Sequence, residues 1–243
     1  MSKILILGAT GSLGEHVAQQ AITANHTVSV FVRSPSRLPK QVRKKATVFE
    51  SDLAEMPASA LANIFQAHDV VINTAGYVAQ GRFFTDLIDH IVTGLESIPE
   101  KDRPVCWFLA GAALLDMDDS GRRGVDLPVI GSTYWPHQVN FDRIHQTTLD
   151  WRILCPGPLV DQPIIGLDRM RISLDQLPIH IPAFLRPLSE ESALQFLTQH
   201  IHEITVSYAD AAALMLAHIN PNDEMSHHRV GLALRDGVQG GKS

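Results

Sequence analysis

Three glycines near the N-terminus constrain the fold most, in the segment Gly8-Ala-Thr-Gly11-Ser-Leu-Gly14. An apolar run, residues 4–7, precedes them and a helical pattern follows, which is the setting of a dinucleotide-binding loop. Gly8 allows the tight turn, Gly11 lets the backbone approach a pyrophosphate, and Gly14 lets the helix pack closely on the strand. Free N–H groups at the start of the helix would face the phosphates. A purely structural turn is the alternative. The loop residues assigned to the cofactor are Gly8, Thr10, Gly11, Ser12, Leu13 and Gly14.

Apolar runs alternating with helical patterns predict an α/β fold with a doubly wound parallel sheet. The strand-like runs are residues 3–8, 27–32, 46–50, 69–74, 104–110 and 151–155. Near-continuous apolar strands of this kind are buried on both faces, and a ligand then binds at their carboxyl ends. Prolines interrupt the chain after Pro156, with helices predicted at 189–200 and 208–218 and a strand at 227–234. We expect a single domain over residues 1–243, in which residues 157–205 form a small cap over the substrate cleft.

Composition excludes several classes of partner. The net charge is −6, and the one basic run, residues 37–45, is short and fits a solvated loop, so nucleic acid is not expected. No apolar run approaches the length of a membrane span or of a signal sequence. Cys106 and Cys155 lie in apolar runs without C-x-x-C spacing, which is typical of buried thiols in a reducing compartment. We expect a cytoplasmic protein of undetermined oligomeric state that acts on a small molecule.

Arg33 ends the second strand, where NAD-selective sites place a carboxylate that binds the ribose 2′-hydroxyl. A guanidinium can instead pair with a 2′-phosphate, and Ser34 and Arg37 can add donors. The sequence therefore predicts a preference for NADP(H), with NAD(H) as the other cofactor it could use. A solvated arginine at a strand end is the alternative interpretation.

The G-x-x-G-x-x-G spacing resembles that of extended and atypical short-chain dehydrogenases/reductases. Residues 33–38 are similar to the NADP(H)-selecting segment of biliverdin-IXβ/flavin reductase relatives. Residues 149–157 and 205–211 are similar to the "LDWT-LSP" and "ISVEDYA" segments of NADH-flavin reductases, whereas residues 168–203 match them poorly. The resemblance implies a Rossmann-like fold and a reductase activity.

The same resemblance implies further contacts with the cofactor. Asp52 and Leu53 would flank the adenine, and small residues would line the ribose and nicotinamide and leave room for two stacked rings. The residues assigned in this way are Asp52, Leu53, Thr74, Ala75, Gly76, Ala110, Gly111 and Pro156.

The chain departs from the superfamily at its catalytic pair, Tyr-x-x-x-Lys. Tyr134 has Gln138 at the lysine position, and residues 110–112 supply no hydroxyl after the fifth strand. A tyrosine ordinarily titrates near pH 10, which is a poor match to proton transfer at neutral pH. His137, near the predicted start of a helix, is the alternative proton donor, because histidine ordinarily titrates near neutrality. Tyr134 and His137 are the candidate catalytic residues.

These features favour an NAD(P)H-dependent oxidoreductase that passes hydride to a flavin, a quinone or a similar conjugated small molecule. Such an acceptor delocalises negative charge, so positioning beside the nicotinamide can suffice. The alternatives are a non-catalytic NAD(P)-sensing regulator and a nucleotide-sugar epimerase or dehydratase. No metal site is expected, because the pairs His200/His202 and His227/His228 lack matching carboxylates or cysteines.

Overall fold

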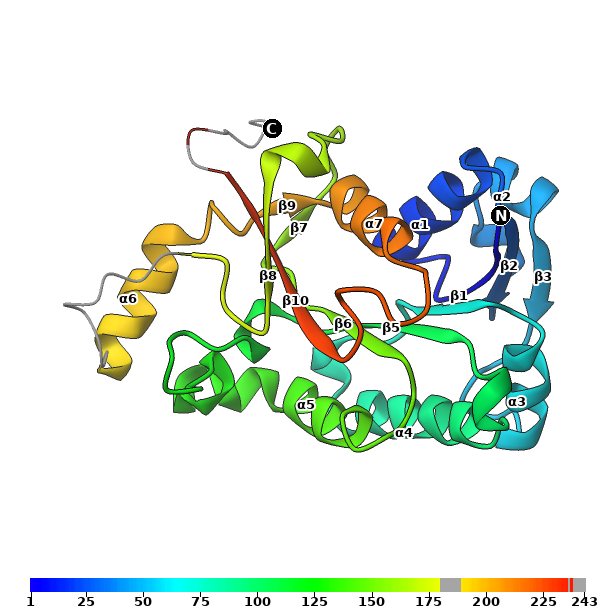
Figure 1. Ribbon diagram of the computed structural model, residues 1–243, viewed down its shortest axis with the longest axis horizontal. Helices are drawn as coiled ribbons and strands as arrows, with labels where there is room; N and C mark the ends of the chain where they lie inside the picture. Colours follow the sequence, from blue (N-terminus) through cyan, green and yellow to red (C-terminus); the bar gives the residue numbers. More distant parts are fainter. Residues whose placement is uncertain (180–188, 236, 238–243) are drawn as a thin grey trace.

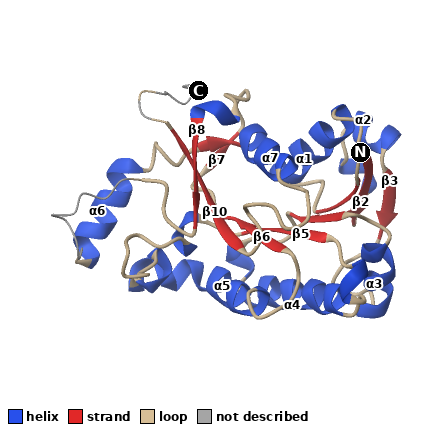
Figure 2. Cartoon of the chain, viewed as in Figure 1, coloured by secondary structure: helices blue, strands red, loops and turns tan. Residues whose placement is uncertain are grey.

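A central sheet organises the computed structural model, which describes residues 1–179, 189–235 and 237 (Figures 1 and 2). In these residues eight strands follow the order β3-β2-β1-β4-β5-β6-β10-β8. Every neighbouring pair is parallel except β10 with β8. The predicted doubly wound α/β fold is therefore confirmed, with one antiparallel strand at its edge. The prolines at 182 and 187 and most of the C-terminal tail lie outside the described residues.

The strands match the apolar runs of the sequence closely. They are β1 Lys3–Leu7, β2 Thr27–Val32, β3 Thr47–Glu50, β4 Val70–Asn73, β5 Val105–Leu109, β6 Trp151–Leu154, β7 Leu159–Val160, β8 Met170–Leu174, β9 Val206–Ser207 and β10 His228–Leu234. The strands β1, β4 and β6 are buried almost throughout, as expected of parallel strands covered on both faces. The strands β7 and β9 form a separate two-stranded parallel sheet.

Helices cover both faces of the sheet. They are α1 Ser12–Thr23, α2 Lys40–Lys45, α3 Ala58–Gln66, α4 Arg82–Glu96, α5 Pro128–Ile144, α6 Glu190–His200 and α7 Tyr208–Ala217. Figure 1 shows α1 and α7 on one side and α3, α4 and α5 on the other. Two apolar clusters follow this division: one packs the sheet against α3, α4 and α5, and the other packs it against α1 and α7. None of the described helices is long and apolar enough to cross a membrane.

A buried carboxylate anchors the loop that follows β7 to the start of α7. Ser207 caps α7, because its Oγ accepts a hydrogen bond from the Asp210 N–H at 2.9 Å. The Asp210 carboxylate, which is fully buried, accepts bonds from the N–H groups of Ile165 and Gly166 at 3.0 and 2.8 Å. Hydrogen bonds from backbone amides compensate the cost of burying this charge. The loop is thus fixed to the body of the fold.

Candidate functional site

The glycine-rich loop joins β1 to α1 and requires glycine at two of its three glycine positions. Gly8 has φ +86°, and a Cβ there would lie 2.7 Å from the backbone nitrogen of Ala75. A Cβ at Gly14 would lie 2.4 Å from the Gly8 carbonyl oxygen and 2.6 Å from Thr74 Oγ1. The loop, the first turn of α1 and the end of β4 therefore meet at van der Waals contact. This is the close packing that the sequence predicts for Gly14.

Gly11 differs from the other two glycines. Its φ is −89°, and a Cβ there would meet only the Gly8 carbonyl, at 3.4 Å. Neither the backbone conformation nor the packing within the chain requires a glycine at this position. A close approach by a ligand would explain it, and Gly11 lies directly before the first N–H groups of α1, which as in any helix lack carbonyl partners in a preceding turn. The loop therefore suits a pyrophosphate, and the assignment of these residues to the cofactor stays a prediction.

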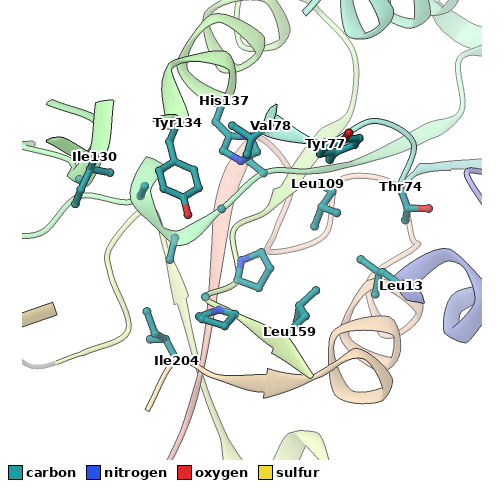
Figure 3. Close-up of a pocket in the computed structure, with 18 of the residues that line it drawn as sticks. Leu13, Thr74, Tyr77, Val78, Leu109, Ile130, Tyr134, His137, Leu159 and Ile204 are labelled. Atoms are coloured by element: carbon teal, nitrogen blue, oxygen red, sulfur yellow. The ribbon is translucent and has the colours of Figure 1, made fainter. Parts of the chain in front are cut away.

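A cavity of about 760 Å³ opens from this loop along the carboxyl ends of β1, β4, β5 and β6 (Figure 3). The strand order of the sheet reverses between β1 and β4, and the cavity lies at the carboxyl ends of these two strands. The predicted site residues that line it are Gly11, Ser12, Leu13, Gly14, Thr74, Gly76, Ala110, Gly111, Tyr134, His137 and Pro156. The fold thus brings together most of the loop, the small residues and both candidate catalytic side chains.

The other predicted residues lie outside this cavity. They are Gly8, Thr10, Arg33, Ser34, Arg37, Asp52, Leu53 and Ala75. Gly8 and Ala75 lie in contact beneath the loop. Leu53 packs in the core and is only 7% exposed, so its assignment to the adenine stays a prediction. Thr10 lies in the loop between β1 and α1, and Arg33, Ser34, Arg37 and Asp52 lie after the ends of β2 and β3.

Arg33 is exposed at the carboxyl end of β2. Its guanidinium NH1 lies 3.7 Å from Asp52 Oδ2, with side-chain exposures of 75% and 35%. Such an exposed pair contributes little to stability, and it leaves the other guanidinium nitrogens accessible. Ser34 and Arg37 are also exposed, on the turn that follows β2. The three residues therefore lie exposed together at the end of β2, and their assignment to a 2′-phosphate stays a prediction.

Tyr134 and His137 both lie in the middle of α5. The expectation that His137 lies near a helix start is wrong, because α5 begins at Pro128 and continues through Pro136. The two rings stack with centroids 6.1 Å apart, and Phe84 meets the imidazole edge to face at 5.8 Å. Figure 3 shows the Tyr134 hydroxyl pointing into the cavity. Gln138, at the lysine position of the superfamily, donates to Asp142 at 2.6 Å on the same helix.

Burial corrects the expected titration of His137. The side chain is 7% exposed, and desolvation by burial lowers its pKa to about 4. The imidazole is therefore neutral at pH 7 and can donate only an N–H hydrogen bond. It does not carry the proton of an imidazolium that the sequence interpretation assumed.

Apolar side chains form the far end of the cavity, and the sequence analysis did not identify them. They are Met117, Ile130, Leu159, Leu177, Leu197, Ile201 and Ile204, and the aromatic and aliphatic side chains of Tyr77, Val78, Phe84 and Tyr208 also line the cavity. Among the described lining residues there is no Lys, Arg, Asp or Glu. Their signals in the sequence were weak, because an apolar residue in a cap looks the same as one in a core. Tyr208 was the exception, since it lies within the segment similar to "ISVEDYA".

Comparison with known proteins agrees with this geometry. Residues 8–176 match the family model described as NAD(P)H-binding. The chain therefore belongs to the NAD(P)H-binding family, and proteins named as reductases are among the solved structures that share its Rossmann-like fold.

Three of those structures cover nearly the whole chain. A candidate NADH-flavin reductase from Streptococcus pneumoniae is 17% identical with a TM-score of 0.70, covering 97% of this chain and 100% of its own. ChuY, an anaerobillin reductase from Escherichia coli O157:H7, is 17% identical with a TM-score of 0.66 and coverages of 98% and 100%. A short-chain dehydrogenase/reductase from Veillonella parvula, in complex with NADP, is 16% identical with a TM-score of 0.65 and coverages of 97% and 96%. At these identities the likeness shows the fold.

Within the described residues no cluster of three or more metal-ligating side chains forms. The absence of a metal from the reaction stays a prediction.

Proposed function

We propose that this protein is an NAD(P)H-dependent oxidoreductase that prefers NADP(H) and passes hydride to a flavin, a quinone or a similar conjugated small molecule. The observation that carries the proposal is the apolar cavity that continues directly from the first turn of α1. A cofactor held at Gly11 and the start of α1 would extend its nicotinamide between Gly76 and Gly111, where small residues leave room for a second ring. The cofactor supplies the hydride, and the chain supplies the positioning.

The polar groups of the site suit such an acceptor. Tyr134 has no lysine partner at position 138, and His137 is neutral, so neither is tuned as a strong acid. Reduction of an isolated carbonyl at a sugar needs a proton relay, which makes an epimerase or dehydratase a poor fit. A conjugated ring spreads the charge that arrives with hydride, and hydrogen-bond donors are then sufficient.

The walls of the cavity favour an uncharged ring system at its buried end. An anion placed among Met117, Leu177 and Ile204 would find no cation on any described lining residue. Burying an unpaired charge costs several kcal/mol even after relaxation. Residues 157–205 supply Leu159, Leu177 and other apolar side chains of this end, which supports their role as the segment that shapes the substrate cleft.

Two observations support the preferred cofactor and the acceptor class. Arg33, Ser34 and Arg37 lie exposed beside the β2 end, and the neighbouring carboxylate, Asp52, is already paired with Arg33. The similar structures include one with NADP bound and two named as reductases of flavin or of anaerobillin, which are conjugated molecules.

The proposal is tested by following NADPH oxidation with a matched pair of acceptors, 1,4-naphthoquinone and its 2-sulfonate, and with riboflavin. We expect turnover with at least one neutral acceptor, and a kcat/KM at least about 100-fold higher for the neutral quinone than for the sulfonate, because the sulfonate would be buried without a cation. The sulfonate is the more electron-poor quinone, so intrinsic reactivity alone predicts the opposite order. NADPH binding without oxidation by any acceptor would support the sensing regulator instead.

Tyr134→Phe is expected to reduce kcat less than about tenfold, because no lysine tunes the hydroxyl and solvent can supply the proton. Loss of a true general acid costs about 10²–10⁴-fold. Stopped-flow absorbance at 340 nm measures the hydride step, and His137→Ala is measured beside it. A thousandfold loss in Tyr134→Phe with unchanged NADPH affinity would contradict this expectation and indicate carbonyl reduction with a tyrosine acid.

A further inference from the structure

Two polar atoms behind the candidate site have no hydrogen-bond partner in the described chain. They are His137 Nδ1 and Asn140 Nδ2, and the side chains that carry them are 7% and 6% exposed. Residues three apart on a helix lie on the same face, so both side chains leave α5 in one direction. An unpartnered polar atom at this depth costs about 1–3 kcal/mol, so two neighbouring ones call for an explanation.

These two residues line a small void together with apolar residues of the core. Its volume is about 10 Å³, and His137 and Asn140 are the polar side chains among the described residues that line it. The other lining residues are apolar, from β5, α4, α5 and neighbouring segments: Ile88, Phe108, Leu109, Ala110, Leu114, Phe141, Ile144 and Ile153. A volume of this size holds one water molecule when polar groups are present to bind it.

We propose that one buried water occupies this void and bridges Asn140 Nδ2 to His137 Nδ1, which makes Asn140 a positioning residue for the imidazole. The amide N–H of Asn140 donates to the water oxygen, and the water donates a hydrogen to Nδ1. A nitrogen that accepts a hydrogen bond carries no proton, so the neutral ring must carry its proton on Nε2. Asn140 therefore selects the tautomer of His137 without touching it.

The position of Nε2 gives this tautomer a consequence for the cavity. A Cβ built on Gly111 would lie 3.4 Å from His137 Nε2, and both Gly111 and His137 line the large cavity. When the water donates to Nδ1, Nε2 carries the proton and lies beside the small residues where a reducible ring would stack. A neutral N–H aimed there stabilises the negative charge that develops on a carbonyl oxygen or ring nitrogen as hydride arrives. This last step depends on the proposed function, whereas the water and the tautomer do not.

Nitrogen-15 NMR of protein labelled at histidine tests the tautomer directly. The His137 ring signals are assigned by their loss in His137→Gln. We expect an imine-type Nδ1 and a pyrrole-type Nε2 in the wild-type protein at pH 7. A pyrrole-type Nδ1 would overturn the proposal, because Nδ1–H would then donate to the water and the water would no longer donate to the ring.

Asn140→Leu tests the bridge, since leucine has nearly the same volume and no hydrogen-bond donor. We expect His137 to lose its single tautomer and to show a mixture in fast exchange. Gln138→Leu alters a neighbouring, half-buried amide that does not line the void, and it should leave the ring signals unchanged. An unchanged His137 spectrum in Asn140→Leu would overturn the role of Asn140. A crystal structure of the wild-type protein that shows the void without a water would overturn the bridge even if Asn140→Leu fails to fold.

Turnover separates this inference from the proposed function. With the neutral quinone, kcat of Asn140→Leu should fall about tenfold, the effect of weakening one hydrogen bond by about 1.4 kcal/mol, while KM for NADPH stays the same. An unchanged kcat would overturn the catalytic consequence. A protein with no reductase activity would still show the predicted tautomer, so the two proposals can fail independently.

Discussion

Gly14→Ala is expected to weaken NADPH binding at least about 100-fold and to lower the melting temperature by about 5–10 °C. The new methyl group would lie 2.4 Å from the Gly8 carbonyl, which is backbone and cannot move aside like a flexible side chain. Helix α1 must therefore shift away from β1, at a cost of about 1–3 kcal/mol, and its first N–H groups leave their positions. Isothermal titration calorimetry and thermal unfolding measure the two effects.

Gly11→Ala is the matched control, because it separates binding from folding. A methyl group at Gly11 meets one atom of the chain at 3.4 Å, and its φ of −89° suits alanine. We expect a melting temperature within about 2 °C of the wild-type value, and NADPH binding weakened by an amount similar to Gly14→Ala. NADPH affinity equal to that of the wild-type protein would contradict the placement of the pyrophosphate at this loop.

Arg33→Asp is expected to weaken NADPH binding by about 1.5–3 kcal/mol, or about 10–150-fold, and to leave NADH binding nearly unchanged. The estimate is that of a charged hydrogen bond to the 2′-phosphate. The pair with Asp52 is exposed, so its loss should not change stability measurably. Titration with both cofactors at one ionic strength gives the ratio of affinities, which is the quantity that matters.

Lys101→Asp provides the control for charge. Lys101 lies in a short turn before β5, away from the carboxyl ends of the strands, and the substitution changes the net charge by the same amount. We expect equal and small effects on both cofactors. If Lys101→Asp weakens NADPH as much as Arg33→Asp does, or if the wild-type protein binds NADH more tightly, the assignment of Arg33 to the 2′-phosphate is wrong.

The sheet was predictable because strands buried on both faces appear in the sequence as nearly continuous apolar runs. The predicted run at 27–32 coincides with β2. The run at 3–8 extends one residue beyond the end of β1, and the run at 104–110 extends one residue beyond each end of β5. The capped helix α7 was predictable for a similar reason, since Ser207 and Asp210 form a local start signal. In each case a few adjacent residues determine the structure.

The rest depended on contacts between distant residues. The strand β8 is an edge strand with alternating burial inside a segment that prolines made look irregular, and it exists because β10 pairs with it. The pKa of His137 could not be read from its sequence position, because the desolvation comes from the fold around α5. The apolar end of the cavity is assembled from β7, α6 and α5, which no local pattern connects.

The position of β10 has a consequence for how the chain folds. Residues 228–234 do not lie at the border of the sheet but between β6 and β8, and β8 is made more than 50 residues earlier. During synthesis, the backbone groups on the free edge of β6 and those of β8 that pair with β10 have no strand partner until β10 has been made. Such non-local strand pairing, parallel with β6 and antiparallel with β8, is slow and leaves aggregation-prone edges open. The β6-β10-β8 half of the sheet should therefore be the last to form, after the β3-β2-β1-β4 half is already stable.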